Sequence, residues 1–287
     1  MKVAIVQTKP RKGDFERNLS ELGEVFAQLA ADAERGTPDL IVLPEAALTG
    51  YFLEGAVYDL AMHSEEIAAR IAAAWRTAAP HKRVDIAFGF YENDAGTYHN
   101  AAMYLTVDHR SHAIVHVHRK MFLPTYGVFD EERFLSRGRC LGAFDTRLGR
   151  MAILICEDMW HSIMPTLAAV KGAQILLVPS ASPGRGLAGD GELESVEYWH
   201  QALRLHAAEH GVYIIYAGLA GFEGGKGMTG SSCIVNPRGE RPFAAPVLGA
   251  HVLRGELDLA EVDLARANLP LLGDLRAVLP DLLTERR

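Results

Sequence analysis

The stretch Ile153-Leu154-Ile155-Cys156-Glu157-Asp158 is a short apolar run that ends at a thiol and two carboxylates. Such a run, bounded by polar residues, is typical of a buried strand. Two other runs have the same form: Ile41-Val42-Leu43-Pro44-Glu45 ends at a carboxylate, and Val115-His116-Val117-His118-Arg119-Lys120 ends at an amine. Because the carboxyl ends of strands in an open α/β sheet border one crevice, we expect Glu45, Lys120 and Cys156 to lie together.

Around these runs, β-rich stretches alternate with amphipathic helical stretches. The predicted strands are 2–8, 40–43, 85–92, 98–107, 113–119, 150–156, 175–179, 212–219, 231–236 and 249–257. The predicted helices are 15–34, with Asp14 as N-cap and Gly36 as stop, 67–78, 162–171 and 194–210. This alternation predicts a largely parallel α/β architecture, which the consecutive strands between 85 and 119 make mixed. Without a linker or repeat, the chain reads as one domain.

Composition narrows the class of protein. The 287 residues are 49% hydrophobic, enough for a large core, and the net charge of −7 argues against a nucleic-acid partner. No apolar run reaches the roughly 18 residues of a spanning helix, so no membrane contact is expected. The N-terminus enters a strand directly and does not read as a signal peptide. Three widely spaced cysteines, Cys140, Cys156 and Cys233, indicate a reducing compartment, and we expect a cytoplasmic protein.

A thiol, an amine and a carboxylate in one crevice suit acyl transfer. The thiolate attacks a carbonyl, the ammonium stabilises the oxyanion, and the carboxylate moves protons. Cys156 precedes a predicted helix whose N-terminus could lower the pKa of the thiol, and the backbone N–H of Glu157 could donate to the oxyanion. The alternative is that Cys156 is a small buried hydrophobe, as many free cysteines are.

Longer motifs around these residues are similar to a known family. The segments Leu43-Pro44-Glu45-Ala46-Ala47-Leu48-Thr49-Gly50-Tyr51, His118-Arg119-Lys120-Met121-Phe122-Leu123-Pro124 and Leu154-Ile155-Cys156-Glu157-Asp158-Met159-Trp160 resemble, in order and spacing, the three signature segments of the nitrilase superfamily. The segment Tyr126-Gly127-Val128-Phe129-Asp130-Glu131-Glu132-Arg133-Phe134 resembles the glutamine-hydrolysing domains of NAD synthetases. The resemblance runs from Lys2 to about Leu257.

The resemblance implies a four-layer α-β-β-α sandwich with mixed sheets. It also implies that Glu45 is the general base, Lys120 the oxyanion stabiliser and Cys156 the nucleophile. A second family glutamate, which orients the scissile amide, falls on Glu131, with the adjacent Glu132 as an alternative. The implied domains are a carbon–nitrogen hydrolase domain over 1–260 and a C-terminal extension over 261–287 that could pack on a partner subunit.

The implied activity is hydrolysis of a small linear amide through a thioester, without cofactor or metal, by a homodimer or higher homo-oligomer. Glu157, Tyr126, Trp160 and Ser182 are the predicted substrate-binding residues, although Trp160 could equally be core packing. The alternatives are a nitrilase, a hydrolase of carbamoyl compounds, or an ammonia-donating subunit of a larger complex. Residues 180–183 read Ser-Ala-Ser-Pro where the glutaminase domains often read Asn-Ala-Ser-Pro, and the printed sequence has no synthetase domain. A complete NAD synthetase is therefore not expected.

Three other patterns compete for a role. His206-Ala207-Ala208-Glu209-His210 fits the zinc motif H-x-x-E-H, but a short match in a chain with 12 histidines favours an ordinary helix C-terminus. The runs 184–189 and 225–230 match G-x-G-x-x-G without sitting at a strand-to-helix turn, so we interpret them as loops, the first bordering the entrance to the site. Cys140 and Cys233 have strand-like surroundings and are expected to be inert.

Overall fold

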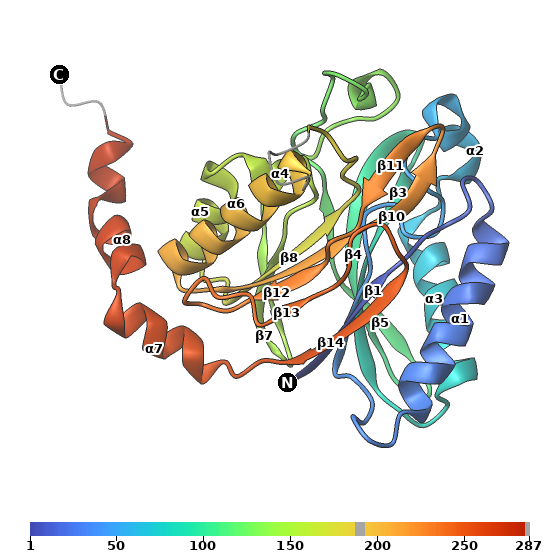
Figure 1. The fold of residues 1–287 in the computed structure, drawn as a ribbon, viewed down its shortest axis with the longest axis horizontal. Coiled ribbons are helices and arrows are strands. Elements are labelled where there is room, and N and C mark those ends of the chain that lie inside the picture. The colour runs from blue at the N-terminus through green and yellow to red at the C-terminus, as the bar shows by residue number, and fades with distance from the viewer. Residues whose placement is uncertain (187–192, 285–287) are drawn as a thin grey trace.

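Strand β1 (Lys2–Gln7) shows why the chain forms more than one layer, because both of its faces are apolar. Val3 and Ile5 point into one hydrophobic core, whereas Ala4 and Val6 point into another. A strand that is apolar on both faces must be covered on both. The computed structural model, which describes residues 1–186 and 193–284, meets this requirement with two facing sheets and an outer layer of helices on each (Figure 1). The predicted four-layer α-β-β-α sandwich is confirmed.

Each sheet has six strands, and both are mixed. The first sheet has the order β14 (His251–Glu256), β1, β2 (Leu40–Val42), β3 (Val84–Asp94), β4 (Thr97–Val107), β5 (His112–Arg119). The second has the order β13 (Phe243–Ala244), β12 (Cys233–Val235), β9 (Tyr213–Gly218), β8 (Ile175–Ser180), β7 (Gly149–Ile153), β6 (Ala143–Thr146). The pairs β1–β2, β2–β3, β7–β8 and β8–β9 are parallel, and the remaining pairs are antiparallel. The parallel centre of each sheet therefore directs its strand ends toward one edge of the sandwich.

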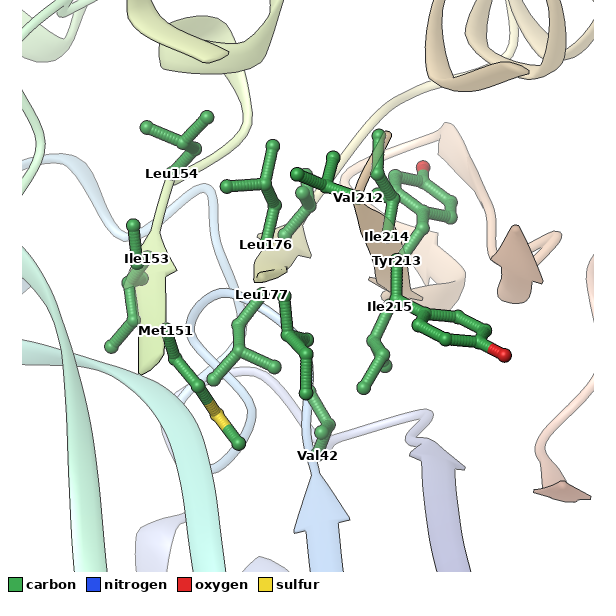
Figure 2. Close-up of a cluster of buried hydrophobic side chains, with 14 of the residues drawn as sticks. Val42, Met151, Ile153, Leu154, Leu176, Leu177, Val212, Tyr213, Ile214 and Ile215 are labelled. Carbon is green, nitrogen blue, oxygen red and sulfur yellow. The ribbon is translucent and has the colours of Figure 1, made fainter. Parts of the chain in front are cut away.

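The space between the sheets is filled by aliphatic side chains. Figure 2 shows Val42 of β2 reaching toward Leu177 of β8 and Ile215 of β9, so that residues of the first sheet meet those of the second. Helices α1 (Phe15–Ala31) and α3 (Ser64–Ala78) cover the first sheet, and α5 (Ile163–Val170) and α6 (Glu194–His210) cover the second (Figure 1). As expected, the Asp14 side chain caps α1 by accepting the backbone N–H of Arg17. The buried sandwich gives the strand ends a rigid support.

Several short elements complete the described part of the chain. They are the 3₁₀ turns η1 (Glu54–Ala56) and η2 (Glu131–Arg133), the helices α2 (Val57–Leu60), α4 (Glu157–Trp160), α7 (Ala260–Asn268) and α8 (Leu271–Leu282), and the hairpin β10 (Ala220–Glu223) with β11 (Lys226–Thr229). The hairpin corrects one prediction: the glycine run 225–230 is not a loop, because Lys226–Thr229 pairs with β10. The other glycine run, 184–189, lies partly outside the described residues.

The boundaries of two elements differ from their prediction. Helix α1 ends at Ala31, and Gly36 follows only after a turn in which its N–H donates to the carbonyl of Asp32. Strand β7 ends at Ile153, although the backbone of Cys156 still donates to the carbonyl of Pro179. A further correction concerns Cys140, which is exposed and lies outside any strand, whereas Cys233 is buried in β12.

The C-terminal segment begins on the body of its own chain. Val262 of α7 and Leu272 of α8 are buried in the core beside the second sheet. Arg276 of α8 donates to the carbonyls of Ala169 and Val170 at the end of α5. Beyond these contacts α8 extends away from the sandwich (Figure 1). No helix among the described residues is long and apolar enough to cross a membrane.

Candidate active site

The three strand ends singled out by the sequence meet in one buried place. Glu45 follows β2 after Pro44, Lys120 directly follows β5, and Cys156 follows β7 after two more buried residues. Glu45 and Lys120 are 0% exposed and Cys156 is 7% exposed. Charged groups are almost never buried to this degree without partners. Each of these buried groups therefore needs partners that offset the cost of removing it from water.

Lys120 joins two carboxylates. Its Nζ donates to Oε1 of Glu45 at 2.9 Å and to Oε1 of Glu131 at 2.7 Å. Burial by itself would lower the pKa of Lys120, but the negative charges of Glu131 and Glu45 outweigh it and raise that pKa well above its ordinary value. The amine is thus held as an ammonium. Since an ammonium has three N–H bonds and two are used here, one remains for a substrate oxygen.

Glu131, at the start of η2, has one occupied and one open oxygen. Its Oε1 accepts from Lys120 and from the hydroxyl of Tyr51, whereas its buried Oε2 has no protein partner among the described residues. Burial raises the pKa of Glu131 to about 7, aided by Glu45 and opposed by Lys120. Glu132 is exposed to solvent. The structure therefore brings Glu131, and not Glu132, into the cluster.

Two further groups hold the general-base candidate. Asn100 of β4 donates from Nδ2 to Oε1 of Glu45 at 2.7 Å and lies 3.4 Å from Oε1 of Glu131. The backbone N–H of Ala181, just after β8, donates to Oε2 of Glu45 at 2.7 Å. Asn100 was missed by the sequence analysis. A single amide inside the apolar run of β4 was the available signal, because a buried polar side chain needs a partner.

Cys156 has a strained backbone, and its sulfur is hydrogen-bonded at the end of β8. Its φ of 45° and ψ of −100° are unusual for a residue with a side chain. Its Sγ accepts a hydrogen bond from Oγ of Ser180, the last residue of β8, at 3.2 Å. Ser180 was also missed, since the sequence analysis chose Ser182 from the same segment.

The net shift of the Cys156 pKa is opposite to the lowering that the sequence analysis considered for a thiol before a helix N-terminus. Burial raises the pKa of the thiol well above its ordinary value, and the charge of Glu45 adds to this effect. Lys120 and Ser180 oppose the shift without overcoming it. The helix that follows, α4, has only four residues, so its N-terminus supplies little compensating charge. The surroundings of the thiol therefore favour its protonated form.

The predicted substrate-binding residues separate into two groups. Tyr126 donates from its hydroxyl to Oε2 of Glu157 at 2.9 Å, and both residues are at least partly open to solvent. The guanidinium of Arg185 lies over the ring of Tyr126, 5.9 Å from its centroid. The carboxylate of Glu157 and the guanidinium of Arg185 thus both lie beside Tyr126, and Glu157 directly follows Cys156.

Trp160 and Ser182 are instead joined through a tryptophan of α6. Trp199 donates from its indole N–H to Oγ of Ser182 at 3.0 Å, and its ring meets that of Trp160 edge to face at 5.3 Å. Trp160 also stacks on Tyr198 at 4.3 Å. These contacts favour the packing interpretation of Trp160. Substrate contact by Trp160 or Ser182 stays a prediction.

The histidine motif forms a separate cluster at the end of α6. Ligand atoms of His206, Glu209 and His210 lie within 4.8 Å of one another, so the structure brings the three residues together. Nε2 of His210 also lies 3.2 Å from the hydroxyl of Thr166. The helix ends immediately afterwards at Gly211, which has the left-handed backbone typical of a helix C-cap. Independence from metal remains a prediction.

The fold and this site define an α-β-β-α protein with a buried thiol, ammonium and carboxylate at its strand ends. The sequence model of the carbon-nitrogen hydrolase family matches residues 2–267. The chain belongs to this family, as its motifs indicated.

The chain also matches individual family relatives along most of its length. It is 27% identical over 261 residues to a glutamine-dependent NAD(+) synthetase of Acinetobacter baylyi, which covers 91% of this chain but only 44% of the synthetase. It is 26% identical over 289 residues to a citrullinase of Francisella tularensis, covering 98% of this chain and 97% of that protein. The crystal structure of a carbon-nitrogen hydrolase from Helicobacter pylori superimposes with a TM-score of 0.85 at 25% identity, covering 100% of this chain and 99% of the other.

Proposed function

We propose that the chain hydrolyses a small linear carboxamide through a thioester on Cys156. The observation that carries this proposal is the open Oε2 of Glu131, since the other carboxylate oxygens of Glu45 and Glu131 already accept hydrogen bonds. A primary amide has two N–H donors, and one of them would satisfy this buried acceptor. A nitrile has no such donor. The geometry therefore favours a substrate that carries N–H bonds at the reacting carbon.

The first half of the proposed reaction forms the thioester. As Sγ of Cys156 attacks the carbonyl carbon, its proton passes to Glu45, because the surroundings of the thiol favour its protonated form. The carbonyl oxygen becomes an oxyanion that the third N–H of Lys120 stabilises, together with the backbone N–H of Glu157. Glu45 then protonates the nitrogen, the carbon–nitrogen bond breaks, and ammonia or an amine leaves.

The second half hydrolyses the thioester. Glu45 takes a proton from water as the water oxygen attacks the same carbon, and Lys120 again stabilises the oxyanion. The carbon–sulfur bond breaks, the proton returns to the thiolate of Cys156, and a carboxylic acid leaves. Each turnover thus consumes one amide and one water, and no step requires a cofactor or metal.

A matched substrate panel tests this proposal. Carboxamides, the corresponding nitriles and carbamoyl compounds would be assayed for ammonia release, with acyl-enzyme mass measured on Cys156 after acid quench. We expect an amide to be hydrolysed faster than its matching nitrile and to leave an acyl mass on Cys156. Faster nitrile turnover, or no acyl mass on Cys156 with any substrate, would overturn the proposal.

A carbamoyl compound is the second candidate substrate. The support is the citrullinase relative, because it aligns with this chain along nearly the whole of both sequences. A ureido group carries the same NH₂–C=O unit as a primary amide and would present the same N–H to Glu131. Release of carbon dioxide together with ammonia in the panel identifies this case, since the carbamoyl thioester hydrolyses to carbamic acid.

The partly exposed side chains of Tyr126, Glu157 and Arg185 would bind the part of the substrate beyond the amide. Glu157, held by Tyr126, offers a carboxylate, and the neighbouring Arg185 offers a guanidinium. We propose that these side chains select substrates with charged groups beyond the amide. The test is Glu157→Gln, which should raise KM for substrates carrying an ammonium group and leave KM for uncharged amides unchanged.

Two proposals concern partners. An ammonia-donating subunit is the alternative suggested by the synthetase relatives, and free turnover in the substrate panel without a partner argues against it. We also propose a homo-oligomer in which the C-terminal extension packs on a partner subunit. It is supported by the apolar residues that α7 and α8 expose, namely Leu264, Leu271, Val278 and Leu282. Light scattering of the full chain and of Val278→Glu tests this proposal, since a monomeric full chain contradicts it.

A further inference from the structure

Asp158, two residues after the nucleophile, is fully buried and accepts four N–H groups. Its Oδ1 accepts the backbone N–H groups of Met121 and Phe122, each at 3.0 Å. Its Oδ2 lies 2.9 Å from Nε2 of His118 and accepts the backbone N–H of Ile155 at 3.1 Å. Nothing in the proposed reaction uses this carboxylate. Its partners nevertheless lie on both sides of the candidate site.

Three of the four donors surround Lys120. His118 is two residues before Lys120 at the end of β5, and Met121 and Phe122 directly follow it. Asp158 itself belongs to α4, which continues from the second sheet, whereas β5 belongs to the first. One side chain therefore links the segment that carries the ammonium to the turn that carries the thiol, across the two halves of the sandwich.

The fourth donor lies on the nucleophile side. Ile155 precedes Cys156, so its bond to Asp158 closes a side-chain turn around the residue with φ of 45°. Backbone in this region is costly for a residue with a side chain and persists only where neighbouring contacts fix it. The backbone bonds Asp158 N–H to Ile155 and Met159 N–H to Cys156 close the same turn. Asp158 thus supports the strained turn as well as the lysine segment.

The donors also account for the buried charge of Asp158. A carboxylate is acceptor-only, and four N–H groups occupy both of its oxygens. Nδ1 of His118 is buried without a partner among the described residues. An unpartnered acceptor lone pair is a smaller cost than a buried N–H without an acceptor. The arrangement is therefore consistent with a histidine that donates from Nε2 to the Asp158 carboxylate and leaves Nδ1 as the unpartnered nitrogen.

We propose that Asp158 is a positioning residue that sets the distance and direction from the ammonium of Lys120 to the thiol of Cys156. The inference rests on the proposed function, in which Lys120 stabilises an oxyanion formed on the carbon that Cys156 attacks. In this proposal Asp158 itself does not contact the substrate. Its effect passes through Lys120, since three of its four hydrogen bonds hold that segment.

The decisive variant is Asp158→Asn. The asparagine keeps one acceptor oxygen, but its NH₂ group then faces N–H donors on the other side and cannot accept from them. We expect kcat per titrated thiol to fall by about 10²-fold, as for a displacement of about 1 Å in a catalytic site, while KM changes little. The matched control is Asp108→Asn, because Asp108 also accepts two backbone N–H groups but lies half-buried in the turn between β4 and β5, away from the site. Its kcat should be unchanged.

A double-mutant cycle separates positioning from general damage. If Asp158 acts through Lys120, then Asp158→Asn should cost no more than about 3-fold in kcat when Lys120 is already alanine. Losses that multiply, or an unchanged kcat per thiol in the single variant, overturn the inference. Failure of the proposed function has a different signature, because the wild-type enzyme would then hydrolyse no amide or Cys156→Ala would remain active.

If Asp158→Asn does not fold, a second pair of variants tests the role of Asp158. His118→Gln keeps an N–H donor near Asp158, whereas His118→Leu fills a similar volume without one. We expect kcat to be largely retained in the glutamine variant and reduced in the leucine variant, with KM similar in both. Equal losses in the two variants would show that the hydrogen bond to Asp158 does not matter and would overturn the inference.

Discussion

Oγ of Ser180 donates to Sγ of Cys156 at 3.2 Å, so the end of β8 directly contacts the candidate nucleophile. A hydrogen bond to sulfur favours the thiolate over the thiol, in opposition to burial. The same segment holds Glu45 through the backbone N–H of Ala181. Residues 180 and 181 thus contact both the thiol and the carboxylate that would take its proton.

We expect Ser180→Ala to slow both alkylation of Cys156 by iodoacetamide and turnover. The loss should be about 10-fold, the order of one hydrogen bond to a developing charge. Ser111→Ala is the control, because the Ser111 hydroxyl donates to Asp108 in the turn between β4 and β5 and lies away from the thiol. Equal alkylation rates in wild type and Ser180→Ala would remove Ser180 from the site.

Both Cys156→Ala and Cys156→Ser should abolish hydrolysis and leave the fold intact. The side chain is small and has one hydrogen bond, so its removal disturbs little packing. Circular dichroism and Tm check the fold, and ammonia release checks activity. Cys140→Ser, which changes an exposed cysteine, should keep full activity. Near-normal turnover by Cys156→Ala would contradict the assignment of the nucleophile.

Lys120→Ala should lower kcat by about 10²–10³-fold, the usual cost of removing one oxyanion donor. It should also lower Tm, because Glu45 and Glu131 would lose their buried cation. Rates are therefore compared per folded enzyme. Lys171→Ala, at an exposed lysine, should change neither quantity. An unchanged rate in Lys120→Ala would show that oxyanion stabilisation lies elsewhere.

Dialysis against a strong chelator should leave activity unaltered, because the proposed reaction uses the thiol, the ammonium and carboxylates only. The histidine cluster of α6 makes this worth measuring, since His206, Glu209 and His210 could hold a metal. His206→Gln is the companion variant and should hydrolyse substrate at the wild-type rate. Loss of activity on dialysis that zinc restores, together with a defect in His206→Gln, would give the cluster a functional role.

The sequence pattern predicted the mixed α/β class and brought Glu45, Lys120 and Cys156 together, whereas the four layers and Glu131 came from the resemblance to the nitrilase superfamily. Apolar runs that end at Glu45, Lys120 and Cys156 mark strand ends, and strand ends in parallel sheets converge. Asn100 and Ser180 could not be placed in the same way. Each is a single polar residue in an apolar strand, and its partner is fixed only by how the strands pair and pack.

The net shift of the Cys156 pKa differs from the lowering that the sequence analysis considered, for a related reason. The sequence analysis predicted a helix over 162–171, where α5 lies, and did not predict the four-residue helix α4 that directly follows the thiol. Nor does the sequence show that the thiol is buried beside Glu45. Burial is the largest of the effects on this pKa, and it raises the pKa. Packing between segments distant in sequence decides which effect on the Cys156 pKa is larger. The same kind of packing places Asp158 in contact with residues 118–122.

The last prediction concerns the pH dependence of Glu131. The ionised form of this carboxyl is acceptor-only and is the better acceptor for an amide N–H, and burial raises its pKa to about 7. The value of kcat/KM should therefore rise as pH increases through about 7 and level off above it. The contribution of Glu131 to the stability of the fold changes with pH in the opposite direction. A carboxyl whose pKa is raised on folding binds its proton more tightly in the native state, so its contribution to stability is complete below pH about 4.5 and declines as pH rises toward about 7.

Two glutamine variants distinguish Glu131 from its neighbour. Glu131→Gln should reduce amide hydrolysis and remove the rise near pH 7, because the glutamine does not titrate. Glu132→Gln changes an exposed carboxyl and should keep both the rate and the profile. The measurement is kcat/KM between pH 5.5 and pH 8.5, a range of about 1.5 units on each side of the pKa of Glu131. If the rise persists in Glu131→Gln, another group titrates there. If Glu132→Gln alone is impaired, the acceptor for the amide N–H has been misassigned despite the open Oε2 of Glu131.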